Sequence, residues 1–150
     1  MAIDLDREPL AETLAKSGMD MRARTAVIWE GVTNYLTADA IDAVLLWVSN
    51  LAAGSTLAFT YVHSDVLSDP ETFDGADRIL RSVAKAGEAW TYGIDPAHLS
   101  GRLQSLGLEL VEDLGANDYR SRYWRSAQSR WRGYAFYRAA LAAVPNHAEA

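Results

Sequence analysis

The 150-residue sequence contains no cysteine, and this absence excludes several kinds of chemistry. Without cysteine there is no disulfide framework and no thiolate to act as a metal ligand or as a nucleophile. The sequence also lacks an apolar run of the roughly 18 residues that a membrane span requires. Its first residues, MAIDLDREP, have no basic region followed by a hydrophobic core, so no secretory signal is predicted. We therefore expect a cytoplasmic protein without a membrane partner.

Common motifs of catalysis and cofactor binding are missing as well. The three histidines, at positions 63, 98 and 147, have no metal-ligand spacing, and no Ser–His–Asp arrangement suggests a catalytic triad. The ten glycines are scattered, and neither a GxGxxG nor a Walker pattern occurs among them. The sequence therefore predicts neither a metal site nor a glycine-rich phosphate loop.

The composition is that of a globular domain with an acidic balance. Hydrophobic residues make up 49% of the chain, and its length is sufficient for one hydrophobic core. The formal net charge of −6 argues against a broad attraction to nucleic acid. Arginines and aromatic residues do alternate in the run 119–131, a pattern that can bind single-stranded nucleic acid. The acidic balance favours instead the packing of these aromatic side chains on the sheet, so no nucleic-acid partner is predicted.

Hydrophobic periodicity predicts alternating strands and helices. Short apolar runs rich in β-branched or aromatic residues predict strands at 25–29, 55–62, 108–114 and 134–141. Apolar residues at helical spacing predict a short helix after Asp6 and further helices at 38–51, 76–86 and 96–106. Strand, helix and strand in succession are typical of a parallel sheet. We therefore predict one α/β domain, residues 1–143, and a disordered tail, residues 144–150.

Polar side chains follow the predicted strands, where ligands bind in open parallel sheets. Glu30 ends the strand 25–29 and is followed by Gly31, which leaves room for close approach. Asp4 ends an apolar stretch at the N-terminus, and His63 follows the strand 55–62. From position alone, Glu30 is equally well explained as a ligand contact or as a residue that caps the loop or pairs with an arginine. A histidine placed like His63 is more often a solvated loop residue than a base.

Several segments resemble the C-terminal half of the leucine carboxyl methyltransferase family, and within it a bacterial branch of S-adenosylmethionine-dependent methyltransferases. The most specific part is the pattern E-G-x-x-x-Y-L, from Glu30 to Leu36. The segments that carry the resemblance are IWEGVTNYLTADAIDAVLLWV, GSTLAFTYV, GEAWTYGIDPAHLSGRLQSLGLELVEDL and YRSRYW. Together they extend over most of the chain.

The resemblance implies a class I methyltransferase sheet, which is Rossmann-like, with strand order 3-2-1-4-5-7-6 and the last strand antiparallel. Residues 1–4 would then end strand three, and the four predicted strands would be strands four to seven. The sequence has no counterpart of strands one and two, nor of their glycine-rich loop. We therefore expect a truncated sheet in which strand four is an exposed apolar edge, as in a fragment or one half of a split protein.

The resemblance also implies a cofactor and a reaction. The cofactor would be S-adenosylmethionine, with Asp4 and Leu5 at its adenine and with Glu30 and Gly31 also in contact with it. The methyl group would go to the oxygen of a carboxylate or of another small molecule. A carboxylate is already ionised at neutral pH, so catalysis would rest on positioning rather than on a general base. Tyr35 and His63 are candidates for the substrate side, and no catalytic residue is predicted.

Two other functions remain open at this point. A chain without the glycine-rich loop can be a non-catalytic remnant, or the partner-binding half of a split methyltransferase that joins a missing N-terminal half. It can also associate with itself through the strand-four edge. A nucleic-acid-binding module built on residues 119–131 is the third and least favoured function.

Overall fold

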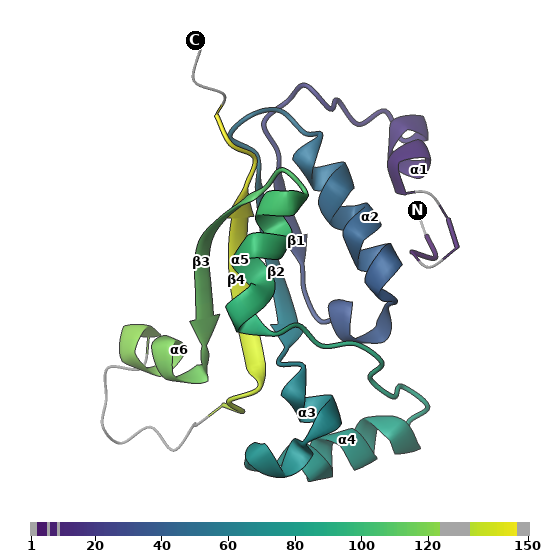
Figure 1. The fold of residues 1–150 in the computed structure, drawn as a ribbon. Coiled ribbons are helices and arrows are strands. Elements are labelled where there is room, and N and C mark those ends of the chain that lie inside the picture. The colour runs from purple at the N-terminus through teal and green to yellow at the C-terminus, as the bar shows by residue number, and fades with distance from the viewer. Residues whose placement is uncertain (1–2, 6, 9, 124–132, 147–150) are drawn as a thin grey trace.

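The computed structural model describes residues 3–5, 7–8, 10–123 and 133–146 and forms an α/β fold around one sheet (Figure 1). The four strands are β1 (Ala26–Trp29), β2 (Thr56–Val62), β3 (Glu109–Gly115) and β4 (Tyr137–Ala143). The first three lie within one residue of their predicted positions. The fourth begins three residues later than predicted.

The strand order confirms the predicted half of a class I methyltransferase sheet. The order is β1-β2-β4-β3, with β1 parallel to β2 and with β4 antiparallel to both of its neighbours. This order corresponds to strands four, five, seven and six of the family sheet, with the last strand in sequence antiparallel. Within the described residues β1 is an edge strand, as the sequence predicts for strand four.

Two of the long helices begin with a side-chain cap. The side chain of Thr37 accepts a hydrogen bond from the Ala40 amide at the start of α2 (Ala38–Ser49). The side chain of Asp95 does the same for the Ala97 amide at the start of α5 (Pro96–Ser105). The other helices are α1 (Leu10–Lys16), α3 (Asp65–Ser68), α4 (Ala76–Lys85) and α6 (Ala116–Tyr123), with 3-10 turns at Thr33–Tyr35 and Pro70–Thr72. No helix among the described residues is long and apolar enough to span a membrane.

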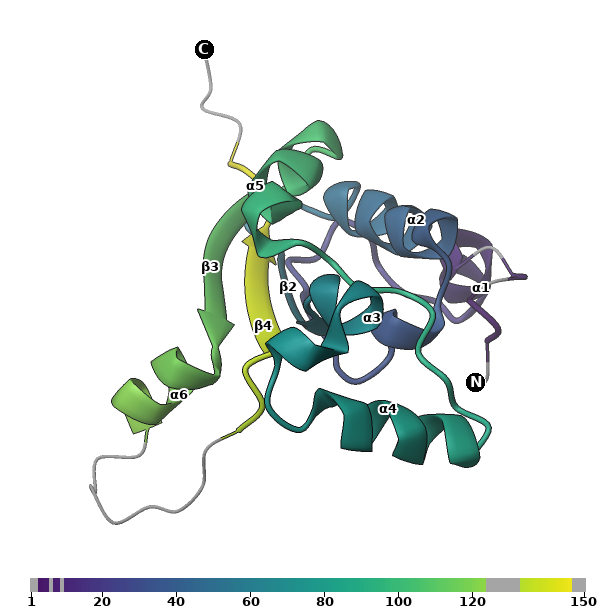
Figure 2. The same ribbon diagram turned by 60° about the horizontal axis from the view of Figure 1, so that its bottom comes forward.

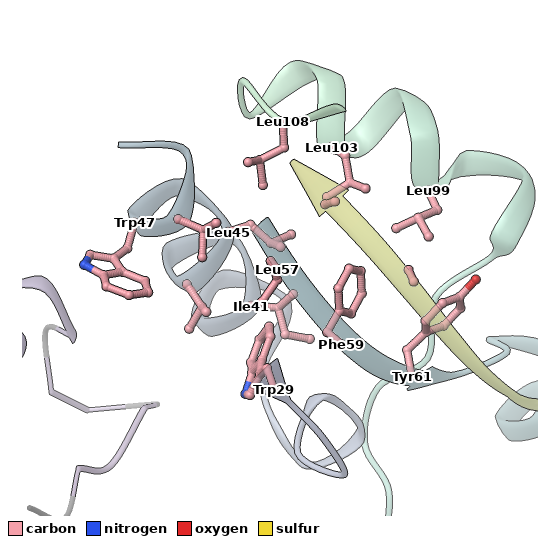
Figure 3. Packing of buried hydrophobic residues seen from close by; sticks show 14 of the residues in the cluster. Trp29, Ile41, Leu45, Trp47, Leu57, Phe59, Tyr61, Leu99, Leu103 and Leu108 are labelled. Carbon is pink, nitrogen blue, oxygen red and sulfur yellow. The ribbon is translucent and has the colours of Figure 1, made fainter. Parts of the chain in front are cut away.

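One face of the sheet is buried, because α2 and α5 both lie on it (Figures 1 and 2). The row formed by Trp29, Phe59 and Ala140 across three strands is buried under these helices. Figure 3 shows the side chains that meet there, from β1, β2, α2, α5 and the residue before β3, among them Ile41, Leu45, Leu57, Leu99, Leu103 and Leu108. On the opposite face the Ile28 side chain, one residue before Trp29, is 80% exposed.

The chain ends differ from the prediction. Ile3 and Asp4 are not in a strand, whereas the resemblance predicts that residues 1–4 end strand three. Instead, the Arg7 and Glu8 amides donate to the Asp4 carbonyl and form a turn. At the other end Val144, in the predicted disordered tail, is buried, and its amide donates to the Ser55 carbonyl at 2.9 Å.

These differences have physical reasons. A strand needs a neighbour that satisfies its backbone groups, and Leu5 packs toward α2 rather than along a strand. Val144 continues the hydrogen bonding of β4 with the start of β2 for one more residue. Residues 1–2 and 147–150, and Asp6, which precedes the first predicted helix, lie outside the described residues.

Two adjacent leucines of α2 test this arrangement. Leu45 is 1% exposed and Leu46 is 50% exposed. We expect Leu45→Ala to lower the free energy of unfolding by roughly 2–5 kcal/mol, because it leaves a cavity in the core. Leu46→Ala, the matched control, should change it by about 0.5 kcal/mol or less. Urea denaturation measures both, and equal losses would contradict the orientation of α2.

Candidate functional site

The pleat of β1 determines where Glu30 lies. Successive side chains of a strand point to opposite faces, so Trp29 enters the core and Glu30 follows on the face of Ile28. The Gly31 amide donates to Thr60 Oγ1 at 2.8 Å, and the Thr33 hydroxyl donates to the Thr60 carbonyl at 2.9 Å. These two bonds attach the loop after β1 to β2. Glu30 is thereby held at the carboxyl end of two parallel strands.

Gly31 is required for its backbone conformation rather than for space. Its φ is +71°, in the left-handed region that favours glycine. A Cβ added to Gly31 would meet no atom within 4 Å other than those of its chain neighbours. The fold therefore explains the glycine at this position by its backbone conformation. Close approach of a ligand, the interpretation from the sequence, is not needed to explain it. The turn directs the chain from the end of β1 toward the 3-10 turn at Thr33–Tyr35.

Glu30 and Gly31 line a cavity of about 480 Å³ on this face of the sheet. Thr60 of β2 and Ala139 of β4, which are paired in the sheet register, also line it. The remaining lining residues come from α6 and from the chain around the start of β4: Ala116, Tyr119, Tyr123, Gly133, Tyr134, Tyr137 and Arg138. This size is in the range of small-molecule sites. The cavity thus joins three segments that are distant in sequence.

Four tyrosines form much of the cavity lining. The rings of Tyr119 and Tyr123 stack with centroids 6.1 Å apart, and those of Tyr134 and Tyr137 lie 6.3 Å apart. Burial, and then the neighbouring charges, including that of Glu30, raise the pKa of Tyr119. Burial, and then Tyr35 and Tyr134, raise the pKa of Tyr137. Both phenols are therefore protonated at neutral pH.

Arg138 connects the cavity with the core. Its Nη2 lies 2.9 Å from Asp113 Oδ2, and its Nε donates to the Tyr61 hydroxyl at 3.0 Å. The Tyr61 hydroxyl in turn donates to Asp113 Oδ2 at 2.8 Å. Burial disfavours the guanidinium charge, yet the contacts with Asp113 and Tyr61 raise the pKa of Arg138. The arginine charge is therefore compensated by Asp113 beside the cavity.

The structure does not bring the other predicted cofactor residues to this cavity. Asp4 lies in the N-terminal turn, with its carboxylate 3.6 Å from Arg7. Leu5 packs against the core and lines a smaller cavity of about 150 Å³, together with Ala43 and Trp47 of α2. Asp4 and Leu5 are thus on the α2 side of the molecule.

The two predicted substrate-side residues lie near the same end of the sheet but do not line the cavity. His63 follows β2 and packs on Phe73, with ring centroids 5.3 Å apart, and its Nδ1 accepts from the Asp65 amide at 3.2 Å. Tyr35 is 38% exposed and lies close enough to Tyr137 to raise the pKa of that residue. Among the described residues, no cluster of His, Asp and Glu is suited to hold a metal ion.

The sequence does not reveal the tyrosines as cavity residues. Tyr119 and Tyr123 fall within the arginine-rich run, and Tyr134 falls within the predicted last strand. The one feature of the sequence that indicates a site here is that tyrosines cluster on both sides of residues 124–132. Residues 124–132 themselves lie outside the described part of the chain. Aromatic residues at the end of a sheet more often pack in the core, so this signal does not specify a cavity.

Comparison with known proteins bears on what this site is. The family model for leucine carboxyl methyltransferase matches residues 1–49, which include Glu30, Gly31 and Tyr35. The resemblance seen in the sequence is confirmed. The model of this methyltransferase family covers about a third of the chain, so the remainder is compared through its fold. No curated protein matches the chain.

Solved structures share the fold. A DUF574 family protein from Streptomyces avermitilis superposes with a TM-score of 0.65 at 18% identity, over 97% of this chain and 54% of that one. A candidate methyltransferase from Thermobifida fusca gives 0.60 at 16% identity, over 97% and 53%. An O-methyltransferase family protein from Burkholderia thailandensis gives 0.56 at 12% identity, over 99% and 36%. The chain spans about half, or less, of the length of these structures, and its fold is that of a methyltransferase sheet.

The Tyr61 network predicts a particular pH dependence. Burial, together with the hydrogen bond to Asp113, raises the pKa of Tyr61 well above its usual value. We expect Tyr61→Phe to lower the free energy of unfolding by roughly 1–2 kcal/mol at pH 8, since Asp113 and Arg138 each lose a buried partner. Above about pH 10 the unfolded wild-type chain ionises this tyrosine while the folded chain does not, so wild-type stability falls and the difference shrinks. Urea denaturation at pH 8 and pH 11 measures this, and a constant difference would contradict it.

Proposed function

We propose that the chain acts in S-adenosylmethionine-dependent transfer of a methyl group to an oxygen atom of a carboxylate or another small molecule. The observation that supports this proposal is the position of Glu30 and Gly31. They directly follow β1 in a methyltransferase sheet and open onto an apolar cavity large enough for a small molecule. Ligands of open parallel sheets bind at this end of the strands.

The described residues offer contacts for one part of the cofactor. The Glu30 carboxylate can accept hydrogen bonds from hydroxyl or amino groups, and it lies at the rim of the cavity. Asp4 and Leu5 remain proposed adenine contacts, although they lie on the α2 side. When bound, the cofactor supplies an electrophilic methyl group. We assign to this chain the binding and orientation of part of the cofactor.

The same cavity is suited to hold the methyl acceptor. Its lining is mainly apolar, which offers a surface for the apolar part of the acceptor. A carboxylate acceptor is ionised at neutral pH and needs no general base. The protonated phenols of Tyr119 and Tyr137 can donate hydrogen bonds that fix the orientation of the acceptor. The site therefore works by positioning.

Binding of the cofactor is the first test of this function. Isothermal titration of S-adenosylmethionine into the purified chain should show saturable micromolar binding, with circular dichroism confirming that the chain is folded. Glu30→Gln should weaken binding about tenfold, because a charge-assisted hydrogen bond is lost. Glu71→Gln, an exposed residue of the 3-10 turn Pro70–Thr72, is the matched control and should leave the affinity unchanged.

The outcomes test separately whether the chain binds the cofactor and whether Glu30 contributes to that binding. A folded chain that does not bind the cofactor would contradict the proposed function for this chain alone. Equal affinities in the wild type and in Glu30→Gln would contradict the role of Glu30. Asp4→Ala tests the adenine contact independently, since Asp4 lies outside the cavity.

A second function, partner binding, is favoured by the open edge of the sheet. β1 pairs only with β2 among the described residues, and Ile28 on it is 80% exposed. An unpaired apolar edge strand is a template for pairing with another chain. The partner would be a second copy of the chain or a separate N-terminal half, and the chain would then be a non-catalytic or complementing component.

A charged residue on the edge tests this alternative. If the chain self-associates through β1, Ile28→Lys should convert the dimer into a monomer in sedimentation velocity at micromolar concentration, because a charge on an edge strand disfavours pairing. Leu46→Lys, which changes an exposed residue of α2, should leave the dimer intact. A wild-type monomer, or a dimer that survives Ile28→Lys, would argue against self-association through this edge.

A further inference from the structure

The cavity combines two features that together select one class of ligand. Four tyrosine side chains, from α6 and from the start of β4, line it: Tyr119, Tyr123, Tyr134 and Tyr137. One carboxylate, that of Glu30, lines it as well, and none of the described residues forms an ion pair with Glu30. Tyrosine rings carry negative charge density on their faces, and cations bind within about 6 Å of the ring centre.

We propose that this cavity binds a substituted ammonium group, so that the methyl acceptor carries such a cation on an apolar body, in addition to the oxygen atom that receives the methyl group. Aromatic rings and a carboxylate are the groups that recognise methylated ammonium ions. The volume of about 480 Å³ accommodates such a group together with the rest of a small molecule. Binding of a cation in this cavity does not depend on the proposed function. The assignment of the bound molecule as the methyl acceptor does rest on it.

The charges around the cavity agree with a cationic ligand. The only other charged residue among the described lining residues is Arg138, whose guanidinium is 2.9 Å from the Asp113 carboxylate and is compensated by it. Glu30 therefore contributes the uncompensated charge in this part of the lining. A ligand that carries only negative charge would meet this carboxylate at close range with no free cation among those residues to offset it, whereas a carboxylate acceptor that also bears an ammonium group would not.

Tyr119 and Tyr137 are neutral, so toward a cation they act through the faces of their rings. The raised pKa values of Tyr119 and Tyr137 mean that neither phenol carries a negative charge at neutral pH. The hydroxyl of Tyr134 accepts a hydrogen bond from Arg78, which does not line the cavity. The polar end of Tyr134 is thereby occupied, and one face of its ring stacks on Phe136 with centroids 5.1 Å apart, so only the remaining part of the ring lines the cavity.

Titration with a defined cation tests the proposal on the full chain. The probe is benzyltrimethylammonium, and the controls are benzyl alcohol, which is neutral, and phenylacetate, which is anionic. By isothermal titration the cation should bind at least tenfold more tightly than either control. Similar affinities for benzyl alcohol and for the cation would overturn the proposal, because the cavity would then recognise only apolar surface.

Variants of one ring separate its face from its hydroxyl. Tyr119→Leu should weaken binding of the cation about tenfold, whereas Tyr119→Phe, which keeps the ring, should retain affinity within threefold. Glu30→Gln should weaken it several-fold, and Glu71→Gln should not. Loss of affinity in Tyr119→Phe as large as in Tyr119→Leu would contradict a role for the ring. Because Tyr119→Phe preserves the packing volume, a folding defect in Tyr119→Leu does not remove the test.

Adding S-adenosylmethionine distinguishes this proposal from the proposed function. Binding of the probe without binding of the cofactor would support the cation site and contradict the methyltransferase function of the isolated chain. Binding of the cofactor without binding of the probe would do the reverse. If the cofactor binds and displaces the probe competitively, the cavity holds the sulfonium cation of the cofactor, and the assignment of the acceptor as a cation is overturned.

Discussion

Burial of one face of the sheet beneath α2 and α5 governs where the other features of the molecule lie. Trp29 must enter that core, where its ring lies 6.4 Å from Phe59. Because strand side chains alternate, Glu30 is then directed to the opposite face. A slip of one residue would exchange the two and place a carboxylate in the core. The position of the candidate site is therefore a consequence of packing on the other side of the sheet.

Polar contacts make this arrangement rigid. Thr60 accepts from the Gly31 amide and from the Thr33 hydroxyl, so the loop after β1 is fixed to β2. Arg138 lines the cavity on one side and binds Asp113 and Tyr61 on the other. A half-buried arginine is favourable only when it is paired in this way. The same network that satisfies the core also compensates the one positive charge among the described lining residues, which favours a cationic ligand.

Elements with a strong period can be predicted from the sequence, and the failures share a cause. The helix 38–51 and the strand 55–62 are predicted well because periodicity and capping are local. The strand predicted at 134–141 begins later because Tyr134 and Phe136 pack with each other, and Phe136 also with Trp90, before the ladder begins. The prediction of a strand at residues 1–4 rests on resemblance alone. Whether a segment forms a strand depends on the presence of a neighbouring strand to pair with. The local sequence pattern does not encode that neighbour.

The amino-acid sequence alone specifies the class of fold, the strand order implied by its resemblance, and the place of Glu30 at the end of a buried strand. These follow from hydrophobic periodicity and from short motifs, which act over a few neighbouring residues. Three-dimensional packing is what brings Tyr119 of α6 and Tyr137 of β4 to the same cavity as Glu30. It also separates Asp4 and His63 from that cavity. Contacts between distant segments depend on how helices and strands pack against one another, and no local pattern specifies them.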